Sequence, residues 1–164
     1  MNNSSHSLVA AFTGHRTYKR SGDDRLRATI EQIYDEGVRL FRVGMAEGFD
    51  LAAGDILLTI REEHPALRIE AIVPYPQFAE RFNICDRQLY KRIISKADIV
   101  RYADQKYHYG VYHKRNDMLV EGADVVVAWW NGRPSGTEYT IGQARRTGCR
   151  IINIYFDSQL KIDF

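Results

Sequence analysis

The segment "DVVVAWWNGRPSGTEYTIGQA" (residues 124–144) decides the fold class, because it joins a buried strand to a clearly marked helix start. Its first part, residues 124–130, is almost continuously apolar, as are strands that are covered on both faces. Its second part contains the S-x-x-E pattern of a capping box, running from Ser135 to Glu138. A buried strand followed directly by a helix is typical of a parallel α/β sheet.

The same alternation of short and long patterns runs through the whole chain of 164 residues. Short apolar runs predict strands, and longer stretches with apolar residues at helical spacing predict the helices between them. The predicted strands cover residues 7–12, 39–44, 67–74, 98–103, 124–130 and 149–156. The predicted helices cover residues 23–37, 49–65, 76–97 (in one or two pieces) and 112–123 and a segment beginning near residue 135. We therefore predict a single α/β domain over residues 1–164, with a Rossmann-like open, mainly parallel sheet and helices on both faces.

Composition and charge narrow the classes of partner. The net charge of +2 argues against a nucleic-acid or membrane partner by charge alone. No segment reaches the roughly 18 apolar residues that a membrane-spanning helix needs. Two lone cysteines, Cys85 and Cys149, are typical of a protein in a reducing cytoplasm. The adjacent Trp129 and Trp130 face opposite sides of their strand, so one can belong to the core and the other to a homo-oligomer interface or a ligand wall.

Candidate ligand-binding residues follow the first two strands, at the edge of the sheet where open parallel sheets bind their ligands. Glycines there let the backbone approach a ligand closely, an arginine offers a cationic fork, and an aspartate suits a ribose hydroxyl. The structural alternatives are plain turns and a stabilised first helical turn. The candidates are Thr13, Gly14 and Arg16 after the first strand, and Gly44, Gly48 and Asp50 after the second.

Further candidates come from the loops after the third and fourth strands. Tyr75 lies where it can stack on a base or simply form a structural loop. A loop rich in tyrosine and histidine follows the fourth strand and suits either a lid or an ordinary surface. At the start of the next helix, Arg115 and Asn116 face the same edge of the sheet, and Arg115 can pair with a phosphate or with a neighbouring acid. His108 and His113 lack the cysteine or paired acid of a zinc site, so no metal is predicted.

The helix start near residue 135 has both a structural and a functional interpretation. If the segment is a capping box, hydrogen bonds between Ser135 and Glu138 explain the presence of both residues without any ligand. Gly136 is a poor helix former, so it and Thr137 fit better with a phosphate that approaches the backbone at the amino end of the helix. Glu138 remains a provisional catalytic candidate. The glycines do not have the G-x-G-x-x-G spacing of dinucleotide-binding folds, and we predict no cofactor.

Taken together, "TGHR", "GMAEGFDLAA", "VPYPQ", "YHKRNDMLV", "ADVVVAWWNG" and "SGTEYTIGQA" resemble the YpsA-like branch of the SLOG superfamily across nearly the whole chain. That superfamily also includes the LOG phosphoribohydrolases and the DNA-processing protein DprA. The resemblance implies a Rossmann-like domain that senses or processes a nucleotide-derived ligand. It implies a glycine-aspartate motif at Gly48 and Asp50 and a phosphate loop at Ser135, Gly136 and Thr137.

The chain departs from the LOG pattern at two points. Arg115 matches the arginine of the R-K-x-x-M motif, but Asn116 replaces its lysine and Leu119 its methionine. Glu138 follows Thr137 directly, whereas the resemblance implies acids two or three residues beyond the threonine. Because one helical residue corresponds to about 100°, this shift turns the carboxylate elsewhere. The departures favour nucleotide binding over N-glycosidic hydrolysis.

Three functions are therefore compared. The leading hypothesis is the binding or sensing of a nucleotide-derived phosphorylated small molecule. The alternative is a nucleoside 5′-monophosphate phosphoribohydrolase, in which Glu138 or Asp50 stabilises charge or activates water and Arg115 holds the phosphate. The third is single-stranded DNA binding by analogy with DprA, for which the near-neutral charge gives little support.

Overall fold

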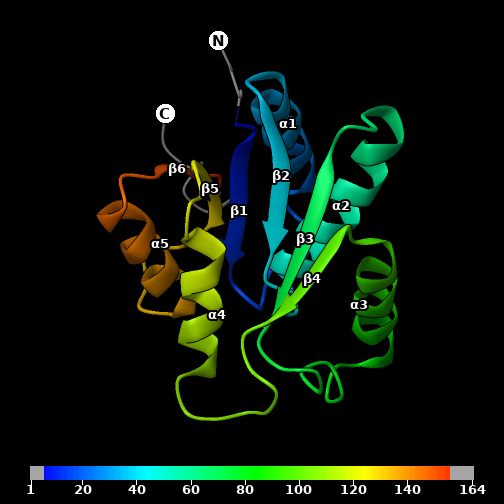
Figure 1. Cartoon of the computed structure of the whole chain (residues 1–164), viewed down its shortest axis with the longest axis vertical. Coiled ribbons are helices and arrows are strands. Elements are labelled where there is room, and N and C mark those ends of the chain that lie inside the picture. The colour runs from blue at the N-terminus through cyan, green and yellow to red at the C-terminus, as the bar shows by residue number, and fades with distance from the viewer. Residues whose placement is uncertain (1–5, 156–164) are drawn as a thin grey trace, which may run out of the picture.

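The computed structural model describes residues 6–155, which form an open, twisted sheet of six parallel strands in the order β4-β3-β2-β1-β5-β6 (Figure 1). The strands are β1 (Leu8–Gly14), β2 (Val38–Val43), β3 (Arg68–Val73), β4 (Ile99–Tyr102), β5 (Val125–Trp129) and β6 (Arg150–Asn153). The predicted Rossmann-like α/β fold is confirmed, and the described part of the sheet is entirely parallel. The last predicted strand ends at Asn153, and Phe156 lies outside the described residues.

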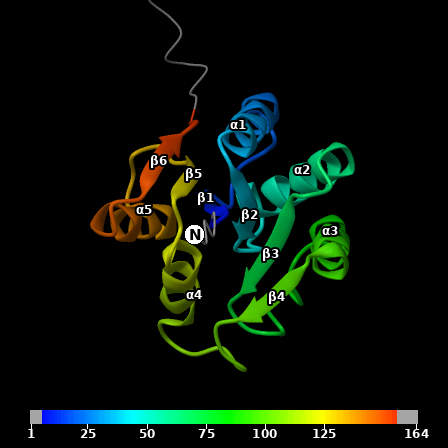
Figure 2. The ribbon, with the colours of Figure 1, turned by 45° about the horizontal axis from the view of Figure 1, so that its top comes forward.

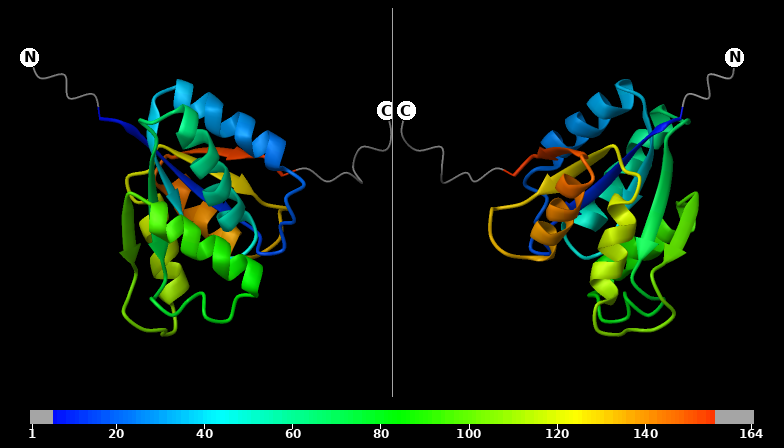
Figure 3. Two further views of the ribbon diagram at one scale, coloured as in Figure 1. Left: turned by 90° about the vertical axis from the view of Figure 1, so that its right-hand side faces the viewer. Right: turned by 60° about the vertical axis from the view of Figure 1, so that its left-hand side comes forward.

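Five helices alternate with the strands and cover both faces of the sheet (Figure 2). They are α1 (Asp23–Asp35), α2 (Phe49–Glu63), α3 (Ile84–Lys96), α4 (Val111–Val120) and α5 (Gly136–Arg146). The first three pack side by side on one face, and α4 and α5 pack together on the other. The two views of Figure 3 look onto these two helical layers in turn.

One helix is shorter than the sequence pattern predicts. The pattern over residues 76–97 is mixed and predicts helix in one or two pieces, but the described helix begins only at Ile84. Residues 75–82 instead form successive turns, such as the bond that the Phe78 amide donates to the Tyr75 carbonyl. Asn83 then caps the helix by accepting a bond from the Asp86 amide at 2.9 Å. These turns keep the aromatic residues of the segment near the carboxyl end of β3.

Most of the apolar core lies between the sheet and the layer formed by α1, α2 and α3. Phe12, Phe41 and Phe49 are fully buried there, and the rings of Phe12 and Phe41 stack at 6.2 Å. A smaller cluster that includes Ile72 and Leu119 lies on the opposite face, beneath α4 and α5. The larger core accounts for most of the burial that drives folding, because hydrophobic stabilisation scales with the buried apolar area.

A buried ion-pair network fixes α4 against the sheet. Glu70 of β3 is 4% exposed, and its carboxylate accepts bonds from Arg42 of β2 at 3.0 Å and Arg101 of β4 at 2.6 Å. Arg42 also donates to the Leu119 carbonyl at 3.1 Å, at the carboxyl end of α4. A cation satisfies the last carbonyls of a helix and complements its dipole. The network therefore positions α4, whose buried side chains line the candidate site.

The order of the strands determines where a crevice opens. Successive strands from β1 to β4 proceed in one direction across the sheet, and β5 and β6 continue from the other side of β1. The connections that leave β1 and β5 therefore go to opposite faces and separate at the carboxyl ends of the strands. This is the topological switch point, where open α/β sheets bind ligands.

Candidate functional site

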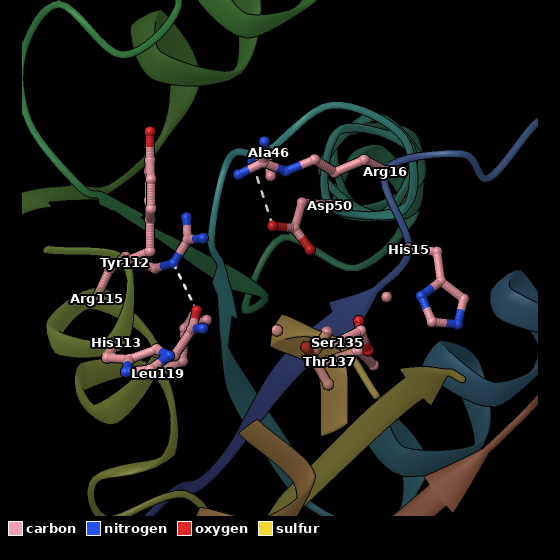
Figure 4. Close-up of a pocket in the computed structure, with 14 residues that line it drawn as sticks. His15, Arg16, Ala46, Asp50, Tyr112, His113, Arg115, Leu119, Ser135 and Thr137 are labelled. Carbon is pink, nitrogen blue, oxygen red and sulfur yellow. Dashed lines mark hydrogen bonds between the residues drawn. The ribbon is translucent and has the colours of Figure 1, made fainter. Parts of the chain in front are cut away.

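A cavity of about 390 Å³ lies at this switch point, and we call it the switch-point cavity (Figure 4). The loop after β1, the start of α2, the inward side of α4 and the amino end of α5 surround it. Nine of the predicted site residues line it, namely Thr13, Gly14, Arg16, Asp50, Arg115, Asn116, Ser135, Gly136 and Thr137. Segments more than 120 residues apart in the sequence thus meet around one space.

The loop after β1 contributes a close backbone approach and a cation. A Cβ atom at Gly14 would lie 2.4 Å from the ring of Phe49, which is fully buried, so only glycine fits against α2 at this point. The chain then turns outward, and the exposed Arg16 side chain extends along the rim of the cavity. A rigid turn with a flexible cation at its end suits the capture of an anion.

The loop between β2 and α2 has an unusual backbone that serves Asp50. Met45 is fully buried with a φ of 66°, a conformation that few residues other than glycine adopt. The next residue, Ala46, donates its amide to the Asp50 carboxylate at 3.2 Å. Gly48 has a φ of 80°, and a Cβ there would lie 2.5 Å from the Arg16 carbonyl. The loop after β1 and the loop between β2 and α2 therefore pack closely against each other beneath the cavity.

Asp50 and Arg115 are buried charged groups in the same cavity, and each is 5% exposed. Burial raises the pKa of Asp50 to about 6, opposed by the positive charge of Arg115, the Ala46 amide and Arg16. Burial lowers the pKa of Arg115, opposed by the Asp50 carboxylate. No ion pair joins Asp50 and Arg115 among the salt bridges of the described residues. The charge of each group is therefore only partly balanced by other groups of the protein.

Arg115 is held in place by neutral acceptors. Its Nε donates to the Asn116 side-chain oxygen at 2.8 Å, and its Nη1 donates to the Gly44 carbonyl. Gly44 does not line the cavity; it accepts this bond from behind the arginine. A buried guanidinium fixed by neutral carbonyls keeps its charge available to an incoming anion.

The amino end of α5 faces the same cavity. Ser135 is the N-cap and accepts a bond from the Glu138 amide at 3.2 Å, which is the serine half of the predicted capping box. Gly136 and Thr137 begin the helix beside the cavity, and a Cβ at Gly136 would meet only the Asn116 side chain, at 3.9 Å. The helix start thus presents backbone N–H groups to an uncrowded space, where an anion is favoured.

Four predicted site residues lie outside the lining. Gly44 and Gly48 support Arg115 and Arg16 from behind, as described above. Tyr75 lines a neighbouring hollow instead. Glu138 is exposed on α5 and is not among the residues that line the cavity. Its carboxylate is thus separate from the group formed by Asp50 and Arg115.

His15 belongs to the cavity, although its sequence context favours an ordinary exposed loop histidine. Its Nε2 accepts a bond from the Asn131 amide at 3.0 Å. Because Nε2 accepts this bond, it is the unprotonated ring nitrogen, and burial lowers the pKa of the ring. Asn131 is 116 positions away, so only the fold reveals this partner. Ala46, Tyr112, His113 and Leu119 also line the cavity; they belong to the quoted motifs but are not among the predicted site residues.

Two features are absent from the described residues. No helix in residues 6–155 is long and apolar enough to cross a membrane. The same residues contain no group of three or more histidine, cysteine or acidic side chains arranged to hold a metal ion.

Comparison with known proteins identifies the family of this chain. A YpsA family model, described as "YspA SLOG family", matches residues 12–154, which include every residue of the switch-point cavity. The chain belongs to the YpsA SLOG family. Among the proteins similar to it is the uncharacterized SPbeta prophage-derived protein YoqJ of Bacillus subtilis, 24% identical over 155 residues that cover 85% of this chain and 91% of YoqJ. A UPF0398 protein of Halalkalibacterium halodurans is 24% identical over 147 residues, covering 86% of this chain and 76% of that protein.

Two solved structures share the fold of this YpsA SLOG chain. One concerns the single-stranded DNA binding mode of DNA processing protein A from Helicobacter pylori, with a TM-score of 0.67 and 16% identity over 90% of this chain. The other is DprA from Streptococcus pneumoniae, with a TM-score of 0.67 and 17% identity over 88% of this chain. The chain spans 65% and 49% of those proteins, respectively. At such low identity the likeness establishes a common fold.

Proposed function

We propose that this YpsA SLOG protein binds or senses a phosphorylated small molecule derived from a nucleotide, with its phosphate in the switch-point cavity. The observation that carries the proposal is the charge around this space. Arg16, Arg115 and the amino end of α5 all face it, with Asp50 as the one carboxylate in the lining. Such an arrangement favours an anion of the size of a phosphate.

The position of each group supports a particular orientation of the ligand. Gly136 and Thr137 offer backbone N–H groups to the phosphate oxygens, and Arg115 adds a charge that is already desolvated. Asp50 serves as an acceptor for a sugar hydroxyl, a role in which a carboxylate is effective. Membership of the SLOG family and the cavity volume of about 390 Å³ both support a small-molecule ligand.

Thermal denaturation and calorimetry with a panel of ligands test this proposal. The panel contains ribose 5-phosphate, the four nucleoside monophosphates, the matching nucleosides and a short thymidine oligonucleotide. We expect the phosphorylated small molecules to stabilise the protein, by about 2.7 kcal/mol at 100 times the dissociation constant. The absence of stabilisation by every phosphorylated member would refute the proposal. Tight, salt-sensitive binding of the oligonucleotide alone would favour DNA binding instead.

A pair of variants on α5 localises the phosphate. Gly136→Asp places a carboxylate at the helix start, where Gly136 has space and where an acidic residue is compatible with the helix. Gly142→Asp adds the same charge to the same helix at a position that has no neighbour within 4 Å. We expect Gly136→Asp to weaken ribose 5-phosphate binding more than tenfold and Gly142→Asp to leave it nearly unchanged. Equal effects of the two variants would place the phosphate elsewhere.

A phosphoribohydrolase activity is the second candidate, and Asp50 favours it. A buried carboxyl with a pKa of about 6 exchanges its proton near neutral pH, as a general acid or base must. Incubation with AMP, GMP, CMP and UMP followed by chromatography measures release of the free base. If base is released, Asp50→Asn should abolish the release and Glu138→Ala should preserve it. Binding without any base release would leave the protein as a sensor.

A further inference from the structure

A second hollow of about 700 Å³ adjoins the switch-point cavity, and we call it the aromatic hollow. We propose that the aromatic hollow holds the base of a nucleotide whose phosphate occupies the switch-point cavity. The inference rests on the proposed function, and it adds the chemical class of the second half of the ligand. The rings that line the hollow are Tyr75, Phe78, Phe82, Tyr107 and Tyr112.

Three tyrosines from three separate places in the fold converge at this hollow. Tyr75 follows β3, Tyr107 lies in the loop after β4, and Tyr112 is in the first turn of α4. The ring centroids of Tyr75 and Tyr107 are 5.8 Å apart, and that of Tyr112 lies 6.0 Å from Tyr107 and 6.5 Å from Tyr75. Phe78 closes the group at 5.9 Å from both Tyr75 and Tyr112. The rings are tilted or perpendicular to one another, so they hold each other at fixed angles.

The two spaces are connected through side chains that line both. Arg16 and Tyr112 belong to the lining of the switch-point cavity and of the aromatic hollow. The Arg16 guanidinium carbon lies 5.5 Å from the centroid of the Tyr112 ring, which holds the cation at the junction. A phosphate bound by Arg16 on one side therefore leaves the rest of the molecule directed toward the rings. This continuity selects a base as the occupant of the aromatic hollow.

The exposure of the rings supports a stacking role rather than a purely structural one. Tyr107 is 61% exposed although it contacts two other rings, so much of its surface remains free for a ligand. Aromatic side chains of this kind stack on any base, because every base has a π-face. Gln77, Glu80 and Arg81 are exposed polar residues in the same lining, and they provide donors and acceptors for the edge of a base.

Calorimetric titration of the full chain with AMP and with ribose 5-phosphate tests the inference, since the two probes differ only by the base. The informative variant is Tyr107→Ala. Its control is Tyr109→Ala, which removes the same side chain from the same loop at a position that is 99% exposed and lines neither space. We expect Tyr107→Ala to weaken AMP binding roughly tenfold, equivalent to about 1.4 kcal/mol. Ribose 5-phosphate binding should change less than about twofold, and Tyr109→Ala should affect neither probe.

Each other outcome has a distinct meaning. If the wild-type protein binds ribose 5-phosphate and AMP equally tightly, the phosphate site stands and the base subsite is refuted. If Tyr107→Ala weakens both probes equally, or if the Tyr107 and Tyr109 variants behave alike, the rings have no specific role toward the base. If the wild-type protein binds neither probe and none of the other nucleoside monophosphates, the proposed function and this inference both fail. Far-ultraviolet circular dichroism of each variant verifies that the fold is retained.

Discussion

Replacement of Asp50 by asparagine should change how the stability of the protein depends on pH. In the native protein Asp50 keeps its proton up to a pKa of about 6, whereas the ordinary value for the unfolded chain is 3.8. Between these two values the native state binds more protons than the unfolded state, so the free energy of unfolding falls as pH rises. Above about pH 6 both states are ionised and the loss is complete.

The size of this loss follows from the two pKa values. Each tenfold difference in proton affinity between the two states contributes about 1.4 kcal/mol, and the interval from 3.8 to about 6 corresponds to about 3 kcal/mol. Asp50→Asn removes this titration and leaves the other titrating groups in place. We therefore expect the stability of the wild type relative to the variant to fall by about 3 kcal/mol between roughly pH 3.5 and pH 7.

Urea denaturation of both proteins at several pH values measures this difference. Asp55→Asn is a matched control on the same helix, because Asp55 is partly exposed and its charge is paired with Arg20 at 3.0 Å and with Arg92. It should not reproduce the relative loss of wild-type stability at neutral pH. Parallel pH profiles for the wild type and Asp50→Asn would refute the reasoning, since Asp50 would then titrate alike in the folded and unfolded states.

Three further substitutions test the packing and the limits of the site. Gly14→Ala should lower the free energy of unfolding by about 1–3 kcal/mol in urea denaturation, because its Cβ would lie 2.4 Å from the buried ring of Phe49; an unchanged midpoint would contradict this close packing. Gly48→Ala should lower the melting temperature, because the added side chain would sit at a φ of 80° and 2.5 Å from a backbone carbonyl. A variant with the melting temperature of the wild type would contradict this strain. Glu138→Ala should leave ribose 5-phosphate affinity unchanged in calorimetry, since Glu138 is exposed and outside the lining, and a large loss of affinity would bring its carboxylate back into the site.

The sequence predicts the order and type of the elements because each depends on a local pattern. The apolar run at residues 124–130 becomes the fully buried strand β5, and the capping residue Ser135 begins α5 where the pattern indicates. The segment 76–97 is the exception. Its mixed pattern predicts helix in one or two pieces, yet residues 75–82 form turns that bring aromatic rings to the Tyr75 cluster. Tertiary packing there overrides local preference.

The site residues also divide into those that local sequence predicts and those that only the tertiary structure reveals. Nine candidates line the cavity because position after a parallel strand is enough to place them at the switch point. His15 is different, since its significance depends on the Asn131 amide from a distant loop. Whether a residue lines the cavity or supports it from outside also depends on contacts between loops, as the backbones of Gly44 and Gly48 illustrate. Spacing in one sequence does not contain that information.

The cavity at the switch point joins two halves of the molecule that otherwise meet across the sheet. Asp50 belongs to the helical layer of α1, α2 and α3, whereas Arg115 and Gly136 belong to the layer of α4 and α5 on the opposite face. A ligand that contacts all three residues links the two helical layers across the carboxyl end of the sheet. Its binding should slow backbone amide exchange in the first turns of α2 and α5 together, although these turns lie in different layers. Occupancy of the site would then be transmitted to both faces of the protein as a common increase in rigidity.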